Sequence, residues 1–217
     1  MIIIACKYDP SRPVIQRAVA SARKFLPNEK ILVVDSDSDD KSYFNDVIAM
    51  GAEIADIKNK NYDTAAYWYG YKNNRNEKFF FCMHDSSYFV ATPPKELYDT
   101  PVTTFMKWKN QNPHTWDMCI GPEIEWGRQQ LAQTSVPFLH TGFNMVFGPI
   151  FFVQSHILQQ LEELGFDKVT VENKVPGVGG SERLWGIAFA AVGHRDFPVL
   201  TPWISDHRAH EYKEGKT

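Results

Sequence analysis

The chain lacks the features that mark several common classes of protein. Its three cysteines, Cys6, Cys82 and Cys119, are odd in number and far apart, which excludes a disulfide framework and a zinc knuckle and favours buried thiols. No apolar run approaches the roughly 18 residues of a membrane span, and the apolar part of the opening MIIIACKYDP is too short for a signal peptide. A net charge of −3 argues against nucleic acid as the main partner. We therefore expect a soluble protein of the cytoplasm.

Two common phosphate-binding sequences are also missing. No Gly-x-Gly-x-x-Gly follows the first apolar segment, so the dinucleotide-binding fingerprint is absent. The glycines at Gly177–Gly180 are followed by Ser181 and Glu182 rather than by Lys-Ser/Thr, so they do not form a Walker A loop. A nucleotide bound here would need another source of positive charge beside its phosphates, and a divalent cation is the simplest candidate.

The first ninety residues alternate between short apolar segments and segments with helical spacing of apolar residues. The pattern predicts strands and helices in turn: Ile2–Lys7, Ser11–Phe25, Lys30–Val34, Ser42–Met50, Ala52–Ile57, Thr64–Tyr71 and Phe79–Met83. Ser11 is expected to cap the first helix, with Pro13 in its first turn. Strands that alternate with helices indicate βαβ units, so we expect an α/β, Rossmann-like fold with a mostly parallel mixed sheet flanked by helices.

The pattern weakens after Val90. Residues Thr92 to about Pro137 show little periodicity. Beyond them the sequence predicts strand-like segments within Phe138–Phe147, helices at Pro149–Leu164 and Ser181–Val192, and an extended piece at Pro198–Ile204.

The fourth apolar segment stops abruptly at His84-Asp85-Ser86. Ligands of parallel sheets bind beyond the carboxyl ends of the strands, where Asp85 could hold a hard cation against phosphate oxygens. A turn residue is the other reading of an Asp in this place. Near the end of the chain, His207 could complete the coordination of a manganese-type ion, with His210 as the alternative.

Polar residues follow the first two strands as well. Lys7 could meet a nucleotide by charge and Tyr8 by stacking, directly after Cys6. Asp35, the first acid of VVDSDSDD, could accept hydrogen bonds from a ribose or a base, as acids do in other nucleotide folds. For Asp35 a solvated acidic turn is an equally good reading, and for Asp39 and Asp40 it is the preferred one.

Glu182 is the candidate general base. It follows a run of glycines and the possible helix cap Ser181, and the positive potential at a helix start favours an ionised carboxylate. A base must be unprotonated to accept a hydroxyl proton. An ordinary acid in the first turn of a helix is the alternative. His140, before Thr141 and Gly142, lies near the expected cleft.

The order of these features resembles the GT-A glycosyltransferases, which bind nucleotide-diphosphate sugars. The matching segments are the acidic turn Val34-Asp35-Ser36-Asp37-Ser38-Asp39, the helix entry Asn61-Tyr62-Asp63, an apolar strand ending near Asp85, and Gly179-Gly180-Ser181-Glu182. The chain departs from the family at its D-x-D sequence, where Met83 replaces the first acid. The compact size and the opening residues are also similar to small GT-A domains of large algal (chlorella) viruses, which would imply a host cytoplasm.

The resemblance implies a GT-A fold and transfer of a hexose from a nucleotide-diphosphate sugar, UDP-sugar being the expected donor, to a hydroxyl of a glycan or glycoprotein. It implies Mn²⁺ or Mg²⁺ held by Asp85 and His207, with Glu182 as base and inversion as the outcome, or retention if Glu182 only positions the acceptor. The implied nucleotide contacts are Cys6, Lys7, Tyr8, Asp35, Asp37, Asn61 and Asp63, and the sugar and acceptor contacts are His140, Thr141, Gly142 and Gly180.

On this reading residues 1–210 form one domain, with a nucleotide-binding half (1–90), an acceptor-side half (91–210) and a frayed tail (211–217). Two other functions stay open. A sugar nucleotidylyltransferase usually has a basic glycine-rich loop after the first strand, where this chain has Cys6-Lys7-Tyr8-Asp9-Pro10. A glycan- or nucleotide-binding module with a dead site is compatible with the eroded D-x-D sequence.

Overall fold

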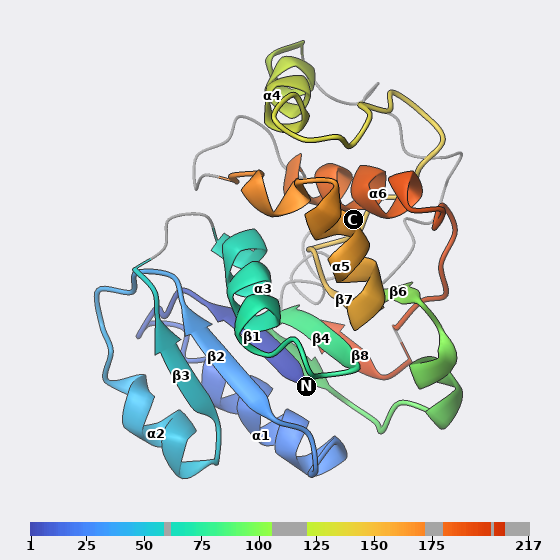
Figure 1. Ribbon diagram of the computed structural model, residues 1–217. Helices are drawn as coiled ribbons and strands as arrows, with labels where there is room; N and C mark the ends of the chain where they lie inside the picture. Colours follow the sequence, from blue (N-terminus) through green and yellow to red (C-terminus); the bar gives the residue numbers. More distant parts are fainter. Residues whose placement is uncertain (59–61, 106–120, 172–179, 201, 207–217) are drawn as a thin grey trace, which may run out of the picture.

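The computed structural model describes residues 1–58, 62–105, 121–171, 180–200 and 202–206. Its helices and strands follow one another along the chain as shown in Figure 1. In chain order they are β1 (Ile2–Cys6), α1 (Ile15–Phe25), β2 (Ile31–Asp35), α2 (Tyr43–Ala49), β3 (Glu53–Asp56), α3 (Tyr62–Asn73), β4 (Phe79–His84), β5 (Ser87–Phe89), η1 (Lys95–Asp99), β6 (Val102–Thr104), α4 (Gly121–Leu131), β7 (Phe151–Gln154), α5 (Ser155–Glu163), η3 (Phe166–Lys168), α6 (Gly180–Ala191) and β8 (Ile204–Asp206).

The centre of the fold is a six-stranded mixed sheet with the order β3-β2-β1-β4-β7-β6. β1 pairs in parallel with both β2 and β4, and β2 pairs in parallel with β3. β7 runs antiparallel to β4 and to β6. A separate two-stranded sheet joins β5 to β8. The predicted α/β class and mixed, Rossmann-like sheet are therefore confirmed.

Helices cover both faces of the sheet because its strands are apolar on both faces. Ile2 and Ile4 of β1 pack with the buried side of α1 and α2, whereas Ile3 and Ala5 pack with α3, α5 and α6. Figure 1 shows α1 and α2 on one side of the sheet and α3 on the other. Every residue of β1 and β2 is buried, as expected for strands covered on both faces.

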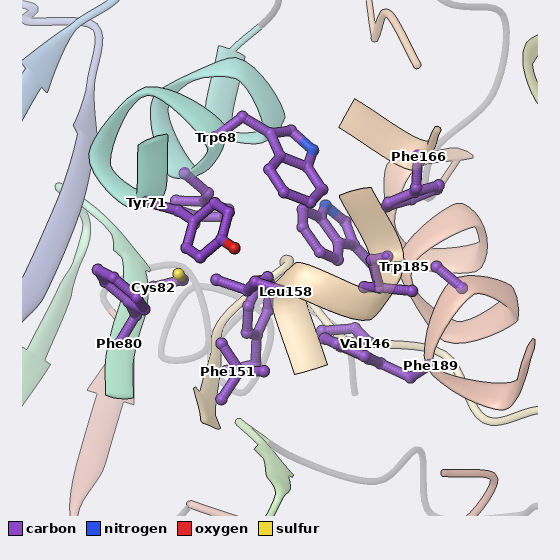
Figure 2. Packing of buried hydrophobic residues seen from close by; sticks show 14 of the residues in the cluster. Trp68, Tyr71, Phe80, Cys82, Val146, Phe151, Leu158, Phe166, Trp185 and Phe189 are labelled. Carbon is purple, nitrogen blue, oxygen red and sulfur yellow. The ribbon is translucent and has the colours of Figure 1, made fainter. Parts of the chain in front are cut away.

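Stacked aromatic rings fasten α6 to α3. The rings of Trp68 and Trp185 lie 6.0 Å apart with an interplanar angle of 20°, and Phe151 and Phe166 pack against Trp185 (Figure 2). Trp185 is fully buried, and its indole N–H donates to the Thr64 hydroxyl at 3.2 Å. Burial of one such side chain contributes about 1.5–3 kcal/mol. The contact sets the second turn of α6 beside the first turn of α3.

Most predicted elements of the first ninety residues agree with the structure to within two residues, but the first helix is an exception. α1 begins at Ile15, four residues after the predicted cap Ser11. The Asp9 carboxylate accepts hydrogen bonds from the Ser11 backbone N–H and hydroxyl, at 2.9 and 2.7 Å, and so folds residues 9–12 into a turn. Asp and Ser side chains commonly stabilise turns in this way.

The second half of the chain differs more from the prediction. The helix predicted over Pro149–Leu164 is wrong in its first part, because residues 151–154 form β7 and α5 begins only at Ser155. Phe138–Phe147 is irregular apart from a bridge at Phe143, and the Val146 N–H donates to the Glu182 carbonyl of α6 instead of joining a sheet. β5, β6 and α4 are absent from the prediction. β8 begins at Ile204, where the predicted extended piece Pro198–Ile204 ends.

Two further expectations concern burial. Cys6 and Cys82 are free, buried thiols as expected, while Cys119 and the predicted tail lie outside the described residues. Within the described ranges, no helix has the length and hydropathy needed to cross a membrane.

The close approach of α6 to the segment before β7 gives a test of the packing. A Cβ added at Gly186 would lie 2.1 Å from the backbone oxygen of Asn144, so Gly186→Ala should destabilise the fold by about 2–3 kcal/mol through overpacking. In a helix without this contact the same change stabilises by about 0.5–1 kcal/mol. Urea unfolding of both proteins measures the difference, and an unchanged or raised stability would contradict the packing of α6.

Candidate functional site

A pocket of about 290 Å³ opens at the carboxyl ends of β1, β2 and β4. After β3 the chain returns to the other side of β1 to form β4, so the order of strands reverses at β1 and leaves a crevice there. The pocket lining comes from the ends of three strands and from the starts of α1 and α3: Ala5, Cys6, Lys7, Asp9, Arg12, Val14, Ser36, Asp63, His84, Asp85 and Ser86. The pocket therefore lies at the carboxyl edge of the sheet, where the sequence predicts a ligand to bind.

Asp85 lies in this pocket, in the turn directly after β4. Its backbone N–H donates to the Ala5 carbonyl of β1 at 3.0 Å, and the residue is half-buried. Burial, followed by the nearby Asp85 carboxylate, raises the pKa of the Cys6 thiol well above its usual value. A raised pKa keeps the Cys6 thiol protonated at neutral pH. Asp85 is the acidic side chain directly beyond β4 on the pocket lining.

A buried carboxylate holds the residue before Asp85. Asp63, in the first turn of α3, is 7% exposed, and its Oδ2 lies 3.0 Å from His84 Nε2. Its Oδ1 accepts hydrogen bonds from the Thr64 N–H and hydroxyl at 2.5 and 3.0 Å. The prediction for Asp63 is a nucleotide contact; the structure places it both in the pocket and against His84.

Glu182 lies close to this pair but does not line the pocket. Its Oε1 accepts a hydrogen bond from the Gly148 N–H at 2.7 Å. Burial raises the pKa of Glu182, while the Gly148 hydrogen bond and the charges of Arg183 and His84 oppose the rise. Among the described residues Glu182 is not part of the pocket lining. A pKa moved toward neutrality suits a residue that exchanges a proton.

The acidic turn after β2 is organised around Asp35, which is fully buried. Its Oδ2 accepts the Tyr43 hydroxyl at 2.7 Å and its Oδ1 accepts the Ser38 N–H at 2.9 Å, with Lys41 Nζ at 3.6 Å. Both oxygens therefore have internal partners. Asp37 is half-exposed and has a φ of 61°, a left-handed conformation that Asp tolerates.

Ser36, rather than Asp35, faces the pocket from this turn. Ser36 is 4% exposed, its N–H donates to the Cys6 carbonyl at 2.7 Å, and its hydroxyl has no hydrogen-bond partner among the described residues. A buried hydroxyl without a partner costs about 1–3 kcal/mol, which a ligand hydrogen bond would recover. Tyr8 also belongs to this region: its N–H donates to the Ser38 hydroxyl at 2.8 Å and its ring lies 4.6 Å from that of Tyr43.

The predicted acceptor residues lie elsewhere. His140 and Thr141 are exposed, Gly142 has a φ of 82°, and neither they nor Gly180 line the described pocket. A Cβ at Gly180 would lie 2.7 Å from the Trp126 ring, so this glycine admits the indole of α4 beside the start of α6. Asn61 and His207 lie outside the described residues.

Sequence reasoning did not single out Arg12, Ser36 and His84, which line the pocket, or Asp206, which is bound to the turn after Asp85. Arg12 and Lys7 are exposed cations on the pocket lining, and Arg12 lies in the turn that begins at Asp9. His84 precedes the predicted residue Asp85 and Ser36 follows the predicted residue Asp35, so their positions in the sequence could have indicated them. Asp206 accepts hydrogen bonds from the Ser86 and Ser87 hydroxyls, a contact across 120 residues that no local pattern predicts.

The residues present fit a cation that arrives with its substrate. Among the described residues there is no cluster of three or more His, Cys, Asp or Glu side chains able to enclose a metal ion. Mg²⁺ is commonly held by one or two carboxylates together with substrate phosphates, without a complete protein cage. Asp85 in the pocket provides one such carboxylate, and Lys7 and Arg12 provide positive charge on the same lining.

The raised pKa of Glu182 gives a test of its burial. The folded state binds this proton more tightly than the unfolded chain, so wild-type stability should fall as the pH rises from the ordinary value of 4.5 through the raised pKa. Glu182→Gln keeps an acceptor for Gly148 but does not titrate. Urea unfolding between about pH 4 and about pH 7 should therefore show the variant gaining stability relative to the wild type. A constant difference would contradict the burial of the carboxyl.

Comparison with known proteins assigns no family to this chain. No protein-family model matches the chain, and no curated protein matches it. The case for a function therefore rests on the pocket at the end of β1, on the carboxylates around it, and on the chemistry that those groups can perform.

Proposed function

We propose that the protein is a metal-dependent glycosyltransferase of GT-A type that moves a hexose from a UDP-sugar to a hydroxyl of a glycan or glycoprotein. One observation carries the proposal: Asp85, Lys7 and Arg12 line a single pocket at the carboxyl ends of parallel strands. This combination suits a nucleoside diphosphate. The Asp85 carboxylate can bind a cation, and the positive charges of Lys7 and Arg12 can neutralise phosphate oxygens.

The donor would lie along the ends of β1, β2 and β4. Asp85, with His207, would hold Mn²⁺ or Mg²⁺, and Lys7 and Arg12 would approach the diphosphate. When bound, the cation supplies charge stabilisation for the departing UDP. The unpartnered Ser36 hydroxyl would face the nucleoside, and Asp35 would keep the turn that presents it.

Glu182 would serve as the general base. The acceptor oxygen forms a bond to the anomeric carbon while the bond to UDP breaks, and the hydroxyl proton passes to Glu182. A single displacement of this kind inverts the anomeric centre; retention follows if Glu182 only positions the acceptor. The raised pKa of Glu182 supports its part in proton transfer, since such transfer is most efficient with a pKa near the working pH.

A binding module without catalytic activity is the second candidate. One observation favours it: Glu182 does not line the described pocket, and its Oε1 is bound to the Gly148 N–H. A module of this kind would bind the nucleotide as the transferase does but would leave the sugar bond intact, so binding and turnover separate the two candidates.

Calorimetric titration with UDP tests the binding half of the proposal. The wild type should bind UDP at least about 10-fold more tightly with Mn²⁺ than with a chelator, and Asp85→Asn should lose that gain because it weakens a metal ligand. Asp167→Asn is the matched control, since Asp167 is bound to Lys72 Nζ at 2.7 Å and does not line the pocket. Equal affinities with and without Mn²⁺ would refute the metal-dependent donor site.

Hydrolysis of a UDP-sugar in the absence of acceptor tests the catalytic half. The wild type should release UDP slowly, and Glu182→Gln should reduce that rate by about 100-fold or more, the usual contribution of a general base. UDP affinity in the same variant should stay unchanged. Binding without hydrolysis in the wild type would instead support the binding module.

A further inference from the structure

We infer that Asp206 is a positioning residue that holds the Asp85 turn in place through the hydroxyls of Ser86 and Ser87. The inference rests on the proposed function, in which Asp85 is the residue that binds the cation and diphosphate. Asp206 itself does not line the described pocket, so its action on a ligand passes through the turn.

The contact joins two distant parts of the chain at one carboxylate oxygen. Asp206 Oδ2 accepts hydrogen bonds from the Ser86 hydroxyl at 2.9 Å and from the Ser87 hydroxyl at 2.8 Å. Asp206 is 3% exposed and Ser87 is fully buried. Hydrogen bonds to an ionised acceptor are about twice as strong as those between neutral groups, and burial shields them from water. The turn is therefore tied firmly to β8.

The backbone pairing beside this turn is short. Ser87 pairs with Asp206 in a two-stranded antiparallel sheet of three residues on each strand. This sheet packs on α1, where the Phe89 N–H donates to the Ser21 hydroxyl at 2.9 Å. The two hydroxyl contacts of Asp206 add side-chain hydrogen bonds to the short pairing, and they act on the residues that directly follow Asp85.

Asp85 is thus fixed from both sides. Its own N–H is bound to the Ala5 carbonyl at 3.0 Å, and the preceding His84 is bound to Asp63. On the other side Ser86 is bound to Asp206. Residues that orient a metal-binding side chain without touching the metal commonly change affinity by 10–100-fold when they are removed. Asp206 belongs to this class by its geometry.

The test measures UDP binding by calorimetry with and without Mn²⁺, beside the thermal unfolding midpoint of each variant. Asp206→Ala should weaken Mn²⁺-dependent binding by about 10-fold, and Asp206→Asn, which keeps an acceptor oxygen for the hydroxyls, should stay within about 3-fold of the wild type. Affinity in the presence of chelator should not change. A purely structural anchor would lower the unfolding midpoint and leave the affinity of the folded protein intact.

Ser86→Ala provides a second, milder probe. Ser86 is half-exposed, so its loss should leave the protein folded even if Asp206→Ala does not fold. The variant should weaken Mn²⁺-dependent UDP binding in the same direction as Asp206→Ala. In a folded double variant the loss should not exceed that of Asp206→Ala alone, because Asp206→Ala already removes the Ser86 contact.

Wild-type affinity in folded Asp206→Ala and in Ser86→Ala would overturn the inference. So would an Asp206→Asn variant as weak as Asp206→Ala, since that result would make the carboxylate charge itself the binding group. If either result is found and Asp85→Asn still loses Mn²⁺-dependent UDP binding, the inference about Asp206 fails but the proposed function is retained. Binding that does not depend on Mn²⁺ or on Asp85 would overturn both.

Discussion

The parallel pairing of β1 with β2 on one side and β4 on the other is the constraint on which the molecule depends. Each residue of β1 is buried, so helices must cover both faces of the sheet, and the chain must leave β1 in one direction and return on the other side. That reversal opens the crevice at the carboxyl end of β1. Most of the residues that line the pocket lie at the carboxyl ends of these strands or in the short segments that follow them.

Carboxylates around the crevice have unequal surroundings. Asp35, Asp63 and Asp206 are buried and each accepts at least two hydrogen bonds from neighbouring groups. Their contacts shape the turns that present Ser36, His84 and Asp85. Because a buried charge needs several donors, these three acids hold the turns around the pocket, whereas Asp85 is half-buried on the pocket lining. All four residues are aspartates, so the differences between them follow from burial rather than from residue type.

The sequence predicts the first half of the fold well because its strands and helices alternate with clear periods. It fails where one pattern allows two structures: the apolar run Phe151–Gln154 reads equally as strand or helix, and pairing with β4 and β6 decides for a strand. The position of Asp85 at the pocket was predictable, because it follows a clear strand. Those of Arg12 and Asp206 were not, because a turn at Asp9 and a contact across the whole chain determine them.

The most direct test of the account is a crystal structure with Mn²⁺ and UDP, with the metal located by its anomalous scattering. The account predicts manganese coordinated by the Asp85 carboxylate and by diphosphate oxygens, in the pocket between the ends of β1 and β4. Manganese and UDP bound elsewhere, or an Asp85 carboxylate turned away from both into the protein interior, would contradict it.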